Sequence, residues 1–540
     1  GASAGGLDAF TKLFQGIPAA TGAAFVLVQH LDPKHASALP ELLARTTPLP
    51  VIEVRETVRV EIDRVYIMPS AMDLAMSDGH LCLVPRALSR GLHMPIDTFF
   101  RSLAKVQAER VIGVILSGTG SDGTLGLEAI KANGGICLAQ DPQSAKYDSM
   151  PWSAINAGCV DTVLPVEELG REIARLAEVF RHLRTPRPEG KGGRGPEDER
   201  QALERLLGHV ARVTSNDLAS YKEPTLLRRV RRRMALQRLT SLDEYVAFVE
   251  RQPAEVNALY EDLLIHVTSF FRGDAAFRSL RRKVFPALLR NRAGGSPLRF
   301  WVPGCSTGEE AYSLAISLLE GLAEMDSTFP IQIFGTDVRP KAIERARAGI
   351  YLESIAADVS PARLERFFVR MDDRFQVSKA VRDLCIFAQH DLIRDPPFSR
   401  LDVISCRNVL IYFNPETQRR IFANFHYGLN ADGYLVLGSS ENAAISSNLF
   451  RPLDREQKIF VPTAVVARPF FGAGVRSAYP RSGAPPPSTV GGRADVQREA
   501  DRILLGRYSP PGVLVDSNLE ILLFRGDTQP YLEHGQGTRA

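Results

Sequence analysis

The sequence has no run of the ~18 consecutive apolar residues that a membrane-spanning helix needs, and no secretory leader opens it. We therefore expect a cytoplasmic protein without direct membrane insertion. The six cysteines form no CxxC pair and no metal-ligand spacing, which predicts reduced core thiols and no metal site. They are Cys82, Cys137, Cys159, Cys305, Cys385 and Cys406. A net charge of +4 is too small for this length to indicate a nucleic-acid partner.

A chain of 540 residues is too long for one core, and roughly three or four domains are expected. Stretches dense in proline, glycine and charge predict linkers at 184–200 and 464–493. Between them, residues 201–275 carry mainly helical periodicity, which predicts a small all-α domain. Residues 1–183 and 276–463 alternate strand-like with helical runs, as α/β domains do.

Short, almost entirely apolar runs at 23–28 and 111–116 predict buried parallel strands, with helices such as 126–133 covering them. The first domain is therefore predicted to be a doubly wound parallel sheet. The second α/β region has five strand candidates, and it is predicted to be Rossmann-like. These candidates are 298–302, 331–335, 385–388, 401–405 and 434–437.

A candidate hydrolytic site combines three separate motifs of the first domain. Ser3 lies in GASAGG (residues 1–6), a glycine-flanked turn typical of a serine nucleophile. His30 follows one apolar run, and Asp122, in SGTGSDG (117–123), follows another. Carboxyl ends of parallel strands share one crevice, so a base and its orienting acid are expected beside the serine.

These motifs, together with Met150-Pro151, resemble the catalytic domain of chemotaxis protein-glutamate methylesterases (CheB) over residues 1–170. The resemblance implies that Ser3 is the nucleophile, His30 the general base and Asp122 its orienter. It also implies hydrolysis of glutamate methyl esters, with deamidation of glutamine as a further reaction. Free-standing members have a methionine, thought to assist the oxyanion hole, where this chain has Thr119.

A second candidate site begins at FWVPGCSTGEE (residues 300–310), a strand followed by a glycine turn and a helix. Such a turn lets the backbone approach a nucleotide-like cofactor, and the helix start offers free N–H groups. Asp337 ends the next strand, where a carboxylate can accept ribose hydroxyls. The turn lacks GxGxxG, which argues against NAD.

With VTSFFR (267–272) and LDVISCRNVLIYF (401–413), this segment resembles receptor-glutamate O-methyltransferases (CheR) over residues 205–462. The resemblance implies S-adenosylmethionine as cofactor, with Asp391 acting through its backbone. The implied contacts are Thr268, Arg272, Glu309, Asp337, Asp391, Leu392, Asn408 and Val409. Arg272 and Tyr412 are candidates for orienting the acceptor glutamate, although Tyr412 could equally be a core aromatic.

Two further motifs suggest competing functions. The DPPF motif at 395–398 matches adenine methyltransferases, but it precedes a strand instead of following one, so base methylation is not expected. In the basic segment 226–234, Leu227, Val230 and Met234 recur at helical spacing, which predicts a buried face with arginines opposite. The resemblance to the methyltransferases implies that these arginines recognise an acidic receptor helix, with a merely solvated face as the alternative.

After the second linker, residues 494–540 comprise a helix candidate at 494–505 and two strand candidates at 512–516 and 521–525. Residues 510–526 resemble the opening strands of a PAS sensor domain, so this α+β end is predicted to be a truncated PAS-like start.

The motifs together predict a bifunctional chemotaxis-type signalling enzyme that methylates receptor glutamates and removes the methyl esters. Expected partners are methyl-accepting receptor proteins, through acidic helices bearing target glutamates, and signalling kinases. A regulatory scaffold with reduced catalysis, and a hydrolase acting on unrelated small esters, remain alternatives.

Overall fold

The computed structural model describes residues 1–30, 38–86, 93–182, 196–214, 218–264, 268–290, 296–465, 512–515 and 521–525. The chain divides into two compact units, Gly1–Ala473 and Gly474–Ala540. Most of both predicted linkers, and the helix expected at 494–505, lie outside the described residues. No helix in the described ranges is long and apolar enough to cross a membrane.

The first domain contains two three-stranded parallel sheets, ordered β1-β4-β2 and β7-β8-β9. Their bounds are β1 Phe25–Leu27, β2 Val51–Glu53, β4 Val65–Ile67, β7 Ile112–Ile115, β8 Ile136–Gln140 and β9 Thr162–Leu164. The first two residues of the chain join these sheets. Ala2 N donates to Val28 O at 3.1 Å, and Leu116 N donates to Gly1 O at 2.9 Å. The segment before Ser3 thus lies between the ends of β1 and β7.

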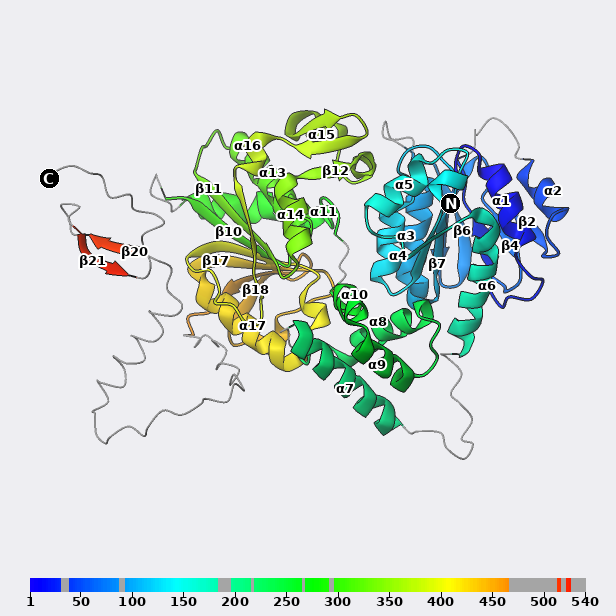
Figure 1. Cartoon of the computed structure of the whole chain (residues 1–540). Coiled ribbons are helices and arrows are strands. Elements are labelled where there is room, and N and C mark those ends of the chain that lie inside the picture. Colours follow the sequence, from blue (N-terminus) through cyan, green and yellow to red (C-terminus); the bar gives the residue numbers. More distant parts are fainter. Residues whose placement is uncertain are drawn as a thin grey trace, which may run out of the picture. The chain divides into compact units, whose positions relative to one another are not determined.

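Helices pack on both faces of these strands, which confirms the doubly wound α/β prediction (Figure 1). One core contains residues of α1 and α6, and the other contains residues of α3, α4 and α5. The helices are α1 Gly6–Gln15, α2 Leu39–Ala44, α3 Pro95–Gln107, α4 Thr124–Ala132, α5 Ser149–Asn156 and α6 Val166–His182. An antiparallel sheet that was not predicted comprises β3 Val58–Arg59, β5 Met72–Ser77 and β6 His80–Pro85.

Residues 196–263 form four helices around a core of their own, in agreement with the predicted all-α domain. They are α7 Pro196–Thr214, α8 Glu223–Leu236, α9 Leu242–Arg251 and α10 Pro253–Leu263. Helix α7 begins inside the stretch predicted as a linker, because its proline occupies a helix N-terminus, where proline is well tolerated.

The second α/β domain has a seven-stranded sheet ordered β15-β11-β10-β16-β17-β19-β18. The first five strands are parallel and are the five predicted from the sequence; β19 runs antiparallel between β17 and β18. The bounds are β10 Leu298–Pro303, β11 Ile331–Asp337, β15 Cys385–Gln389, β16 Leu401–Cys406, β17 Leu429–Leu437, β18 Phe450–Asp454 and β19 Ile459–Pro462. The strand order reverses between β10 and β16, which is where ligands bind in such sheets.

Helices and a small antiparallel sheet complete this domain. The helices are α11 Asp274–Ser279, α12 Phe285–Arg290, α13 Glu309–Glu324, α14 Pro340–Ala348, α15 Pro361–Phe367, α16 Lys379–Arg382 and α17 Pro415–Gly428. The additional strands, ordered β12-β14-β13, are Ile350–Leu352, Arg374–Val377 and Phe368–Met371. All six cysteines are free thiols, as predicted.

In the second unit, β20 (Gly512–Val515) and β21 (Ile521–Arg525) form an antiparallel pair. The two strands agree with the sequence prediction. The PAS-like identity of this end stays a prediction.

Candidate functional site

Ser3 lies in the crevice at the carboxyl ends of the first domain's parallel strands. Its backbone N–H donates to Ser117 O at 3.1 Å, and α1 begins three residues later. A Cβ atom at Gly118 would lie 2.9 Å from the Cβ of Ser3 and 2.2 Å from the sulfur of Met150. The SGTGSDG motif therefore needs glycine at this position, because the serine turn and Met150 both pack against it.

His30 and Asp122 form the expected imidazole–carboxylate pair, with Nε2 and Oδ2 2.7 Å apart. The backbone N–H of His30 donates to Ala2 O, the residue before the serine. Asp122 is only 2% exposed and also accepts the N–H groups of Ile96 (3.0 Å) and Asp97 (2.9 Å), at the start of α3. The two N–H groups at the start of α3 therefore fix the position of the carboxylate.

The pairing determines which imidazole nitrogen faces away from the acid. Because Nε2 of His30 faces Asp122, Nδ1 is the ring nitrogen that points away from the acid. In the described residues no hydrogen bond joins the Ser3 hydroxyl to this imidazole. Such contacts often tighten only when substrate binds.

A second imidazole–carboxylate pair, which sequence reasoning missed, lies beside the first. His93 Nε2 and Asp73 Oδ1 are 2.8 Å apart, and the His30 and His93 ring centroids are 6.2 Å apart. The sequence gives no signal for this pair, because β5 and the start of α3 come together only in the fold.

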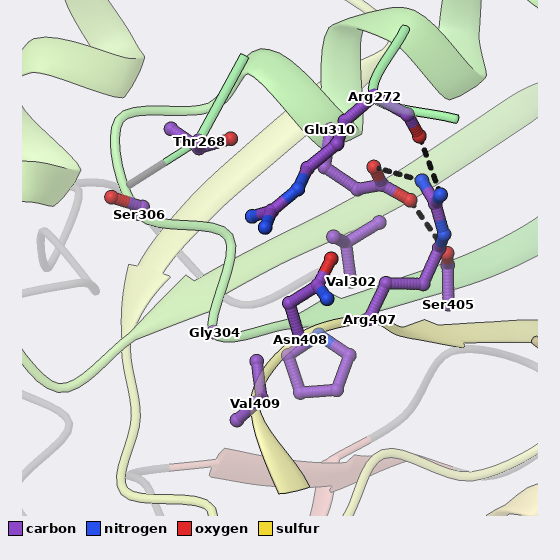
Figure 2. A pocket seen from close by; sticks show the side chains of 11 residues that line it. Thr268, Arg272, Val302, Gly304, Ser306, Glu310, Ser405, Arg407, Asn408 and Val409 are labelled. Carbon is purple, nitrogen blue, oxygen red and sulfur yellow. Dashed lines mark hydrogen bonds and ion pairs between the residues drawn. The ribbon is translucent and has the colours of Figure 1, made fainter. Parts of the chain in front are cut away.

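A recess in the second α/β domain gathers four of the residues predicted to contact a cofactor (Figure 2). These are Thr268, Arg272, Asn408 and Val409. Gly304, in the turn after β10, has a φ of +66°, and a Cβ atom there would lie 2.6 Å from Val409 Cγ2. We call this part of the recess, around Gly304, the cradle. Only glycine keeps it open for the close approach of a cofactor.

A neighbouring recess contains three further predicted contacts, Asp337, Asp391 and Leu392. It shares Gly304 and Val409 with the first recess, and the two enclose about 430 and 590 Å³ including open solvent. Asp337, at the end of β11, accepts the N–H groups of Ser306 and Arg339, both at 3.0 Å.

The all-α domain contributes side chains to this second recess. Tyr221 and Tyr260, together with Leu218 and Leu264, line it along with Asp337 and Asp391. Sequence reasoning missed them, because no motif links residues of one domain to a site in another. Apolar and aromatic walls with a carboxylate at the strand end suit a nucleoside.

Glu309 was predicted to contact the cofactor, but of the two glutamates after the glycine turn it is Glu310 that lines a recess. Glu310 lines the first recess and pairs with Arg407 (2.7 Å) and Ser405 (2.9 Å) (Figure 2). Glu309 lines neither recess; it accepts a hydrogen bond from Thr307 Oγ1, and burial raises the pKa of its carboxyl to about 7. Adjacent helical residues point in different directions, so only one of the pair faces the recess.

Arg272 and Tyr412 are neighbours, as their proposed joint role requires. Arg272 lines the first recess, where burial lowers the pKa of its guanidinium. Tyr412 lies in the 3₁₀ turn Leu410–Tyr412, and burial raises the pKa of its phenol, opposed by Arg229 and Arg272. Tyr412 is not among the residues lining either recess. Arg407, which also donates to the backbone oxygen of Arg272, was missed.

The arginine-rich helix α8 differs from the predicted two-faced helix. Val230 and Met234 are buried as expected, but Arg229 and Arg232 are each only 1% exposed. Arg232 forms ion pairs with Asp161 and Asp262, and Arg229 donates to the backbone oxygens of Lys131 and Ala132. The prediction that the arginines lie on an open face is therefore wrong for these two, because their side chains bind carboxylates and backbone carbonyls in the interior.

Three known family profiles match the chain. The CheB methylesterase profile matches residues 1–173, the all-alpha domain of CheR methyltransferases matches 201–264, and their SAM binding domain matches 266–459. The class of protein is thus a methylesterase domain joined to a methyltransferase domain that binds S-adenosylmethionine.

Relatives agree with the profiles. A 104.1 kDa protein from the hypE 3′ region of Rhodobacter capsulatus is 37% identical over 92% of this chain, which spans about half (54%) of that relative. Chemotaxis protein methyltransferase 2 of Pseudomonas aeruginosa is 35% identical over 49% of this chain and 93% of the relative. The chain belongs to the chemotaxis methyltransferase (CheR) family and carries a CheB methylesterase domain.

Among solved structures, the Thermotoga maritima CheB methylesterase catalytic domain is 28% identical over 32% of this chain and 95% of that chain, with a TM-score of 0.31.

Proposed function

We propose that this chain transfers methyl groups from S-adenosylmethionine to receptor glutamates and hydrolyses the resulting esters through Ser3, His30 and Asp122. The observation that carries the proposal is the presence, in one chain, of an imidazole–carboxylate pair beside a serine turn and a cofactor cradle around Gly304. The expected substrates are acidic helices of methyl-accepting receptors.

In the hydrolytic reaction, the Ser3 hydroxyl attacks the ester carbonyl carbon while His30 Nδ1 takes its proton. Backbone N–H groups at the start of α1 are suited to stabilising the oxyanion. The proton then passes from His30 to the departing methoxide, which leaves as methanol. Water, activated by the same imidazole, cleaves the acyl–serine bond and regenerates the free glutamate and Ser3. Asp122 keeps the imidazole in the tautomer that this sequence needs.

In the transfer reaction, S-adenosylmethionine supplies a methyl group already activated on a sulfonium. The acceptor carboxylate is ionised at neutral pH, so no protein base is required. Positioning remains the main task. Arg272, on the wall of the first recess, is suited to orienting the acceptor carboxylate, with Tyr412 beside it. Asp337, Asp391 and the two tyrosines of the all-α domain would hold the adenosyl part.

The test incubates the whole chain with S-[methyl-³H]adenosylmethionine and receptor fragments containing the acidic helices. Label should enter the fragment as a base-labile ester, and after a chase with unlabelled cofactor it should leave as methanol. A fragment with its target glutamates changed to alanine is the control. Cofactor binding without label transfer would contradict the proposal and favour the scaffold; release from small esters but not from the fragment would favour the unrelated hydrolase.

A further inference from the structure

Glu441, four residues after β17, is a buried carboxylate that accepts hydrogen bonds from four backbone N–H groups. It is 5% exposed. Its Oε2 accepts the N–H groups of Asn408 (2.8 Å) and Gly438 (2.6 Å), and its Oε1 accepts those of Val409 and Leu410, both at 2.8 Å. Within the described residues it forms no ion pair with a lysine or arginine. Its charge is therefore compensated by four peptide dipoles.

These hydrogen bonds hold the 408–410 turn in place. Asn408 has a φ of +61°, in the left-handed region that, among non-glycine residues, asparagine tolerates better than most. Consecutive N–H groups that converge on one side form a concave anion site. Glu441 fills that site with the protein's own carboxylate, and the three buried donors of residues 408–410 would otherwise need other acceptors.

Residues of the same turn line the two recesses. Asn408 and Val409 line the first recess (Figure 2). Val409 also lines the second. Val409 leaves no room for a Cβ atom at Gly304, so a small shift of the turn would narrow or open the cradle.

We propose that Glu441 is a positioning residue of the methyl-donor site, acting through the 408–410 turn without touching the cofactor. The proposal depends on the cofactor-binding domain alone. It would therefore survive a failure of methyl transfer to receptors.

The test compares Glu441→Gln with Asp402→Asn in the whole chain. Glutamine keeps the shape but turns an amino group toward backbone donors, so the turn should shift. We expect the affinity for S-adenosylhomocysteine, measured by calorimetry, to fall roughly 10-fold or more, as when outer-shell partners of a ligand site are lost. Asp402 is a matched control: it is 3% exposed and accepts Arg299 N (2.8 Å) and Asn430 Nδ2 (2.9 Å) at the opposite end of β16.

Asp402→Asn should lower the thermal midpoint by a similar amount while leaving the affinity within about 2-fold. Wild-type affinity in Glu441→Gln, or an equal loss in Asp402→Asn, would overturn the proposal. If Glu441→Gln does not fold, Gly438→Ala tests the same contact, because its Cβ would lie 2.7 Å from Glu441 Oε2 and 2.9 Å from Asn408 N. That variant should also weaken binding, and unchanged binding would again refute the role.

Discussion

The two crevices of this chain occupy the same place in their folds but are built from different chemistry. Each lies at the carboxyl ends of parallel strands. The first domain presents an imidazole paired with a carboxylate, His30 and Asp122, next to a serine turn. The second crevice contains the glycine turn at Gly304. There a backbone N–H group holds the Asp337 carboxylate, and Arg407 holds the Glu310 carboxylate. Ester hydrolysis must move protons, whereas methyl transfer to a carboxylate must chiefly hold two partners in line.

The largest expected difference between the two crevices comes from removing the proposed nucleophile, Ser3. Ser3→Ala should lower methanol release from a methylated receptor fragment by about 10⁶-fold, because no covalent intermediate can form. Affinity for S-adenosylhomocysteine, measured by calorimetry on the same variant, should be unchanged. Substantial residual hydrolysis would show that another group acts as nucleophile.

Removing only the orienting charge should have a smaller effect. Asp122→Asn should reduce methanol release by about 10⁴-fold, since the imidazole loses the acceptor that sets its tautomer. The neighbouring His93–Asp73 pair supplies the control: Asp73→Asn should leave the rate within a few-fold. Equal losses in both variants would mean that the two pairs work together and that the triad is incompletely assigned.

In the other crevice, the corresponding change should affect binding and not a proton-transfer step. Asp337→Ala should weaken S-adenosylhomocysteine binding by about 2 kcal/mol, roughly 30-fold, because buried polar groups lose their partner. The exposed Asp383→Ala is the control and should bind normally. Unchanged affinity by calorimetry would remove Asp337 from the cofactor site.

The last prediction concerns stability instead of either reaction, and it involves an acid that lies outside both recesses. The pKa of Glu309 is raised from 4.5 to about 7 by burial, so the folded state holds a proton that the unfolded state releases between these values. The wild type therefore loses stability as pH rises through this window, by at most about 3 kcal/mol at 1.36 kcal/mol per pKa unit.

Glu309→Gln removes that ionisation. In calorimetry, the unfolding transition that shifts on adding S-adenosylhomocysteine identifies the methyltransferase domain. In that transition, the difference in free energy of unfolding between Glu309→Gln and the wild type should grow in favour of the variant from pH 4.5 to 7 and then level off. The exposed Glu365→Gln serves as control and should show no such growth. A pH-independent difference between wild type and Glu309→Gln would contradict the raised pKa.

The parts of this molecule that are predictable from sequence are those encoded locally. Strand-like runs predicted all five parallel strands of the second sheet. In the first domain, the motifs that follow apolar runs predicted that His30 lies beside Asp122. The β5–β6 hairpin was missed, although Asp78-Gly79, both with positive φ, is a recognisable two-residue turn.

Other features depend on distant partners and could not be predicted. The burial of Arg229 and Arg232 follows from carbonyls and carboxylates that lie far away in sequence. The same is true of Glu441, whose acceptor role becomes visible only once the 408–410 turn is folded. Periodicity identifies an amphipathic helix, but it does not reveal which charged side chains find buried partners.

Tyr221 and Tyr260 line the second recess from outside the domain that carries the glycine turn. The border between the two matched family profiles, near residue 265, therefore runs through the residues of a single recess. Grafting a foreign segment 266–459 onto residues 201–264 of this chain would build a recess from two unmatched halves. Both regions would therefore need to be exchanged together in any chimaera expected to bind the cofactor.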